Sequence, residues 1–187
     1  LAINFLLTFL VDQSPLVMYQ TQDFIRDHHL NEQRVVEALK NDIEGIFSSE
    51  KEKVLEGIKI LLNILTTHSL DKKTVIDLAI PPDKFITKVK DSDQDLKLKF
   101  YELLDKFDDP RFNDIIIYGF QSSSEEIRIE SLKLVSLLTT PPDLKAYAFL
   151  LKDTQETVRA EAFCAAYVNG DFQETIVQKH LKVETSQ

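Results

Sequence analysis

The sequence predicts an all-α fold in which antiparallel helix pairs stack into an α-α superhelix. Three observations lead to this prediction. Apolar residues recur at helical spacing over most of the chain, and no two segments alternate with the period of paired strands. The 187 residues include only 4 glycines and 6 prolines, too few turn formers for a fold of many strands. Finally, the second half of the chain repeats itself at a spacing of 31 residues.

The first half of the chain contains several helices that can be assigned in order. Asn31 can cap a helix over residues 31–47, and a second helix begins near Ser49. A short extra helix is expected near 71–79. Later helices are expected to begin at prolines. The N–H groups of a first helical turn have no partner within the helix, so proline, which has no N–H, loses nothing there.

The repeat becomes visible when the chain is shifted against itself by 31 residues. Segments that start at Asp91, Ser122 and Asp153 then align, each with a polar cap followed by an apolar and a basic residue. The aligned basic residues are Lys97, Arg128 and Arg159. The second helix of each repeat is expected at 111–120, 142–151 and 172–181.

Four parts of the chain follow from this alignment. They are residues 1–48 with an apolar N-terminal helix and degenerate or capping helices, a first repeat with an insertion at 49–90, three 31-residue repeats at 91–181, and a polar tail at 182–187. Residues 1–11 predict a buried terminal helix, with the end of a membrane helix as the alternative. No regular element is assigned to residues 12–30, where Pro15 interrupts the pattern.

The segment from Asp153 to Ala162 resembles the first helix of a HEAT repeat. It is most similar to the short repeats of about 30 residues known from phycobilin lyases, which combine an acidic cap, a Val-Arg pair and small residues. The resemblance implies a HEAT- or armadillo-like solenoid. It also implies a structural ladder of Lys97, Arg128 and Arg159. In such a ladder the arginine of one repeat binds an acid or a carbonyl of its neighbour, with Glu125, Glu126 and Glu156 as acids at hand.

Candidate chemical sites are weaker than this repeat pattern. Asp91, Asp93, Asp95 and Glu102 have the spacing of calcium ligands, but Leu96 stands where a calcium loop needs glycine, so a charged helix N-terminus is the preferred interpretation. The His28-His29 pair is interpreted as a helix end. Cys164 lies in an apolar stretch and is expected to be buried rather than reactive. We therefore expect no catalytic, cofactor or metal site and no enzyme activity.

These features favour a non-catalytic scaffold or adaptor that binds a protein or peptide. The concave face of such a solenoid is lined by the second helices. The candidate contact residues on this face are Asn113, Asp114, Lys145, Tyr147, Gln173, Glu174 and Lys179.

Composition bears on the partner and the compartment. The net charge of −9 favours a basic or neutral partner and disfavours nucleic acid. The single cysteine suggests a reducing, cytoplasmic compartment. Two alternatives stay open. One is a nucleic-acid-binding enzyme similar to the HEAT-like DNA-repair glycosylases, and the other is a cytoplasmic regulatory domain of a membrane protein.

Overall fold

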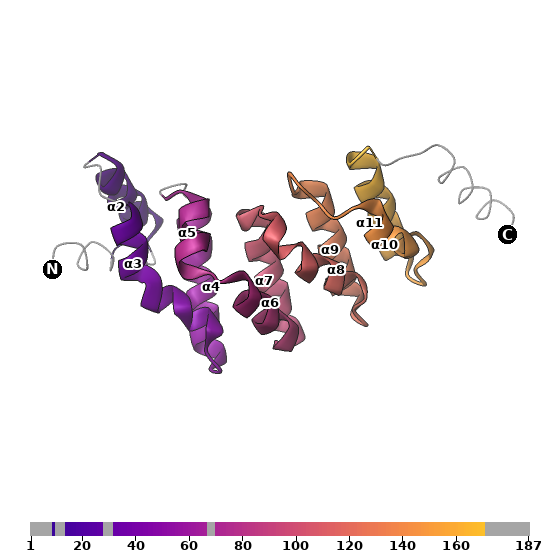
Figure 1. Cartoon of the computed structure of the whole chain (residues 1–187), viewed down its shortest axis with the longest axis horizontal. Helices are drawn as coiled ribbons and strands as arrows, with labels where there is room; N and C mark the ends of the chain where they lie inside the picture. Colours follow the sequence, from indigo (N-terminus) through magenta and orange to yellow (C-terminus); the bar gives the residue numbers. More distant parts are fainter. Residues whose placement is uncertain (1–8, 10–13, 28–31, 67–69, 171–187) are drawn as a thin grey trace, which may run out of the picture. The chain divides into compact units, whose positions relative to one another are not determined.

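The protein is all-α in the part that the structure describes. The structure, a computed structural model, describes residue 9 and residues 14–27, 32–66 and 70–170, and every regular element among them is a helix (Figure 1). This confirms the prediction that the fold is all-α. The chain divides into two compact units, unit 1 with residues 1–107 and unit 2 with residues 108–187. None of the described helices is both long and apolar enough to cross a membrane.

Unit 1 consists of six described α-helices and one 3₁₀ turn. In chain order these are α2 (Pro15–Asp27), α3 (Glu32–Ile43), η1 (Glu44–Phe47), α4 (Lys51–Thr66), α5 (Lys72–Ala79), α6 (Pro82–Asp91) and α7 (Gln94–Phe107). Helix α3 packs against α4 and α5, and α4 packs against η1 and α7. Helix α6 packs against α7 and η1, so α4, α6 and α7 surround one core.

The core of unit 1 is built around an aromatic cluster. The ring of Phe85 on α6 meets the ring of Phe100 edge-on at 5.3 Å and that of Phe107 at 5.5 Å. All three rings are fully or almost fully buried, and edge-on contacts of this kind add to the gain from burying the ring area. Phe85 lies on the buried face of α6, three residues after the proline that begins the helix. The start of α6 at Pro82, which the sequence predicts, therefore fixes the position of Phe85 in the core.

Two predictions for unit 1 need adjustment. The helix predicted over 31–47 is α-helical only to Ile43 and then tightens into η1, where Gly45 lies against the backbone of Lys53 on α4. Residues 15–27 are helical although no element was assigned to them. Pro15 begins α2, and proline suits a first helical turn, so it marks a start here rather than an interruption. The short helix expected near 71–79 is present as α5, capped by the Asp71 carboxylate, which accepts the Thr74 N–H at 2.9 Å.

Unit 2 contains the second helix of the first 31-residue repeat, the whole second repeat and the third repeat as far as residue 170. Its elements are η2 (Pro110–Phe112), α8 (Asn113–Phe120), α9 (Glu125–Leu137), α10 (Leu144–Tyr147), η3 (Ala148–Lys152) and α11 (Glu156–Val168). The first helices α9 and α11 pack side by side, as Figure 1 shows. Helix α8 packs against α9, and η3 packs against α11. The predicted helix 172–181, the tail and the His28-His29 pair lie outside the described residues.

The second helix of the second repeat differs from the single helix predicted over 142–151. The helix begins only at Leu144, where the Asp143 carboxylate caps it, and it changes to a 3₁₀ helix at Ala148. Pro141 and Pro142 therefore precede the helix instead of starting it. The segment Ile115–Tyr118, which taken alone resembles a strand, lies inside helix α8.

Candidate interaction surface

The structure places four of the predicted contact residues and corrects one of them. Asp114 and Lys145 are exposed, and Asn113 is half-buried with its Nδ2 donating to the Thr140 carbonyl at 3.1 Å. Tyr147 is 0% exposed, so its predicted exposure is wrong. Its ring lies 5.6 Å from that of Phe120 in the core of unit 2. The remaining three, Gln173, Glu174 and Lys179, lie outside the described residues.

Two exposed aromatic residues occupy equivalent positions in the second helices of unit 2. Tyr118 on α8 is 42% exposed, and Phe149 on η3, 31 residues later, is 51% exposed. Each has exposed polar neighbours four residues before it and three residues after it, and these neighbours are also 31 residues apart. We name these two sets the first stripe (Asp114, Tyr118 and Gln121) and the second stripe (Lys145, Phe149 and Lys152).

The sequence analysis named one residue of each stripe and missed both aromatics. The repeat contained the signal that could have found them. Tyr147 aligns with Ile116 and Phe149 with Tyr118, so the 31-residue alignment pairs one apolar position with another and one aromatic position with another. The buried pair and the exposed pair differ by two residues, which places them on different sides of the helix.

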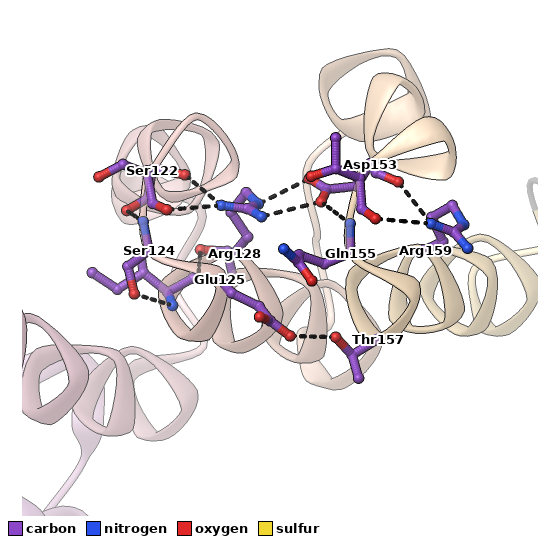
Figure 2. Close-up of polar contacts among 12 residues, drawn as sticks. Ser122, Ser124, Glu125, Arg128, Asp153, Gln155, Thr157 and Arg159 are labelled. Carbon is purple, nitrogen blue, oxygen red and sulfur yellow. Dashed lines mark hydrogen bonds and ion pairs between the residues drawn. The ribbon is translucent and has the colours of Figure 1, made fainter.

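A polar junction links α9 to the loop before α11 (Figure 2). The Arg128 guanidinium of α9 reaches the Asp153 carboxylate before α11, with Nε 2.9 Å from Oδ2 and Nη2 3.1 Å from Oδ1. Both side chains are only 11% exposed. Arg128 also donates from Nη1 to the carbonyls of Ser122 and Ser123. The planar guanidinium thus binds its own loop and the next repeat at once.

The loops before α9 and α11 share the same hydrogen-bond pattern. Arg159 donates to the carbonyls of Asp153 and Thr154, the same six-residue and five-residue offsets that Arg128 uses. Ser122 Oγ accepts the N–H two residues later, and Asp153 Oδ1 does the same. The 31-residue spacing is therefore present in the backbone contacts of unit 2 as well as in its sequence.

The acids that serve this junction differ from those named in the sequence analysis. Arg128 pairs with Asp153, not with Glu125, Glu126 or Glu156. Glu125 instead accepts a hydrogen bond from the Thr157 hydroxyl of the next repeat. Lys97, the third member of the predicted ladder, is half-buried on α7 in unit 1.

One of the carboxylates with calcium-like spacing, Asp93, caps a helix. Asp93 Oδ1 accepts the Leu96 N–H of α7 at 2.9 Å, and its Oδ2 lies 3.1 Å from the Lys51 ammonium of α4. The Leu96 N–H, and after it Lys51, hold the pKa of Asp93 below its ordinary value of 3.8. Asp95 also pairs with Lys51, at 3.4 Å. Among the described residues, no three potential ligands are grouped so that they could hold a metal ion.

Cys164 is exposed on α11, so the prediction that it is buried is wrong. In the 31-residue alignment Cys164 matches Lys133, which is also exposed on α9. The small buried residues that surround it in sequence, Ala162, Ala165 and Ala166, lie on the other side of the helix.

Comparison with known proteins provides a likeness of fold. No protein-family model matches the chain, and no curated protein is similar to it in sequence. One similar solved structure is the crystal structure of an engineered protein from the Northeast Structural Genomics Consortium. It is 14% identical with a TM-score of 0.52, and the match covers 97% of this chain and 94% of that one. At this identity the likeness concerns the fold alone.

Proposed function

We propose that this protein is a non-catalytic interaction module that binds a protein or peptide on the second helices of unit 2. The observation that supports this most directly is the pair of exposed aromatics, Tyr118 and Phe149, at equivalent repeat positions. Large aromatic side chains dominate the binding energy of protein interfaces, where they enter pockets of the partner. A partner segment that follows the second helices would meet one aromatic for each repeat.

The polar junction between α9 and α11 supports the same proposal. Arg128, Asp153 and the loop carbonyls hold α9 and α11 in a fixed relation, and α8 and η3 pack against these two helices. A surface on such a support loses little conformational entropy when it binds. We further propose that the repeats are HEAT-like and stack as a solenoid, which would bring the second helices onto one continuous face.

The test removes both aromatics and follows a partner. The full chain serves as bait in a lysate of its source, captured proteins are identified by mass spectrometry, and each candidate is then titrated against purified chain. We expect the Y118A/F149A variant to weaken the direct binding by about tenfold or more, as the loss of interface hot spots does. Because both side chains are exposed, the variant should keep its fold, which circular dichroism can check.

A matched control removes two exposed apolar side chains from the first helices instead. Leu137 on α9 and Val168 on α11 are also 31 residues apart, and both are exposed. The L137A/V168A variant should bind like the wild-type chain. A partner that is lost with L137A/V168A but kept with Y118A/F149A would contradict the proposed surface and move it to the ends of α9 and α11.

A further inference from the structure

The two cations of the second stripe have no acidic partner among the described residues of unit 2. Most other cations there have one at short distance. Arg111 lies 2.7 Å from Asp109, Arg128 lies 2.9 Å from Asp153, and Lys133 lies 2.7 Å from Glu130. Lys145 and Lys152 are exposed, and no described carboxylate pairs with either of them. The two nearest acids in the sequence have other roles, because Asp143 caps the start of α10 and Asp153 pairs with Arg128.

The exposed aromatic lies between these two cations in the chain. Residues three apart in a 3₁₀ helix lie above one another, so Phe149 and Lys152 share one side of η3. Lys145, four residues before Phe149, lies on α10, which ends at Tyr147. The second stripe is therefore an exposed aromatic residue with one exposed lysine before it and one after it.

We propose that the second stripe binds an acidic segment of a partner protein. In this segment one large apolar side chain packs on Phe149, and carboxylates on either side pair with Lys145 and Lys152. The inference rests on the proposed function and specifies the chemistry of the partner. It differs from the basic or neutral partner that the net charge of −9 favours. Net charge acts over long distances on the rate of association, whereas the charges in contact decide which residues can meet.

The first stripe directs the acidic segment to the second stripe. Asp114 stands where the second stripe has Lys145, so the same carboxylate would meet a like charge on α8. Gln121 replaces Lys152 and provides no charge. A partner that crosses both stripes should therefore be acidic over η3 and neutral or basic over the start of α8.

The experiment selects binders from a display library of short random peptides, with the full chain as target. We expect the selected peptides to be enriched in Asp and Glu on both sides of a Phe, Leu, Tyr or Trp. One selected peptide is then labelled and titrated by fluorescence anisotropy. The K145E/K152E variant should bind it about tenfold or more weakly, because two attractive contacts become repulsive. Selection on this variant should enrich Lys and Arg instead.

A matched variant separates local contacts from overall charge. K59E/K72E makes the same change in net charge at two exposed lysines of unit 1, on α4 and α5. It should alter the binding of the selected peptide by less than about threefold, because neither lysine belongs to the second stripe and salt weakens the effect of exposed charges outside a contact. Equal losses in the two variants would overturn the inference.

Other results of the peptide selection separate a failure of this inference from a failure of the proposed function. A selection that yields basic peptides, peptides without charge preference or no peptides at all overturns the acidic-segment inference. If Y118A/F149A still loses its protein partner in that case, the proposed interaction surface stands with a partner of different chemistry. If the Y118A/F149A variant also binds like wild type, both the inference and the proposed function fail.

Discussion

Asp153 is the residue at which the contacts between the two repeats of unit 2 converge. Its carboxylate pairs with Arg128 of the preceding repeat and accepts the Gln155 N–H, and its carbonyl accepts from Arg159. Serine occupies the equivalent position 122, and it accepts the N–H two residues later but has no carboxylate. The capping role is thus shared by the repeats, while the ion pair to the preceding repeat depends on the change from Ser to Asp.

We predict that D153A destabilises unit 2 by about 2–4 kcal/mol, because it leaves a largely buried guanidinium without its acid and a loop N–H without its acceptor. Urea unfolding of the full chain, followed by circular dichroism, measures this change. The control is K133A, which breaks the exposed ion pair with Glu130 and should cost no more than about 1 kcal/mol. A loss for D153A no larger than that for K133A would show that the junction contributes little to stability.

At the scale of elements, α4 packs closely on η1 in unit 1. A Cβ atom at Gly57 would lie 2.7 Å from Ile46 Cγ2 and 2.8 Å from the Ile46 backbone nitrogen. Ile46 is fully buried, so its side chain has little freedom to move away. Glycine at position 57 therefore reflects the approach of two backbones rather than a turn.

The G57A variant tests this contact. Alanine favours a helix over glycine by about 1 kcal/mol, but the overpacking against η1 should dominate and destabilise unit 1 by about 1–3 kcal/mol. Thermal unfolding of the full chain shows directly whether the G57A variant is less or more stable than the wild-type chain. The neighbouring exposed residue provides the control, since E56A should change the stability by less than about 0.5 kcal/mol. A G57A chain that is more stable than wild type would contradict the observed packing.

The elements that sequence reasoning predicted are those with a strong local signal. Helices α4, α5, α9 and α11 follow from caps and helical spacing, and the start of α6 follows from its prolines. The change from α10 to η3 within residues 144–152 was missed, because a 3₁₀ and an α helix have similar apolar patterns over so few residues. Cys164 was misplaced because its apolar neighbours were weighed, rather than the exposed lysine to which it is equivalent.

The candidate site was predicted less well than the fold, for a physical reason. The repeat identifies equivalent positions, but it does not say which side of a second helix is covered by the neighbouring helices. Tyr147 and Phe149 are both aromatic and both lie in the predicted second helix, yet one is in the core and the other is exposed. The repeat pairs Phe149 with Tyr118 and Tyr147 with Ile116, and the packing then shows which of the two pairs is exposed.

At the scale of the whole molecule, each unit has a core of its own. The aromatic cluster around Phe85 belongs to unit 1, and the ring pair of Phe120 and Tyr147 belongs to unit 2. The contacts that G57A affects lie within unit 1, and the ion pair that D153A removes lies within unit 2. Proteins open locally in cooperative units, so a substitution whose contacts lie in one compact unit is expected to destabilise that unit first.

We therefore expect hydrogen exchange to separate the two units. G57A should speed the exchange of core amides in α4 and α7 and leave α9 and α11 unchanged, whereas D153A should do the reverse, because each substitution lowers the opening free energy of its own unit. Mass spectrometry of peptides from the exchanged full chain provides the measurement, with wild type as reference. If either variant speeds exchange equally in both units, the chain unfolds as one cooperative body, and the effects of the two substitutions should then add in a single unfolding transition.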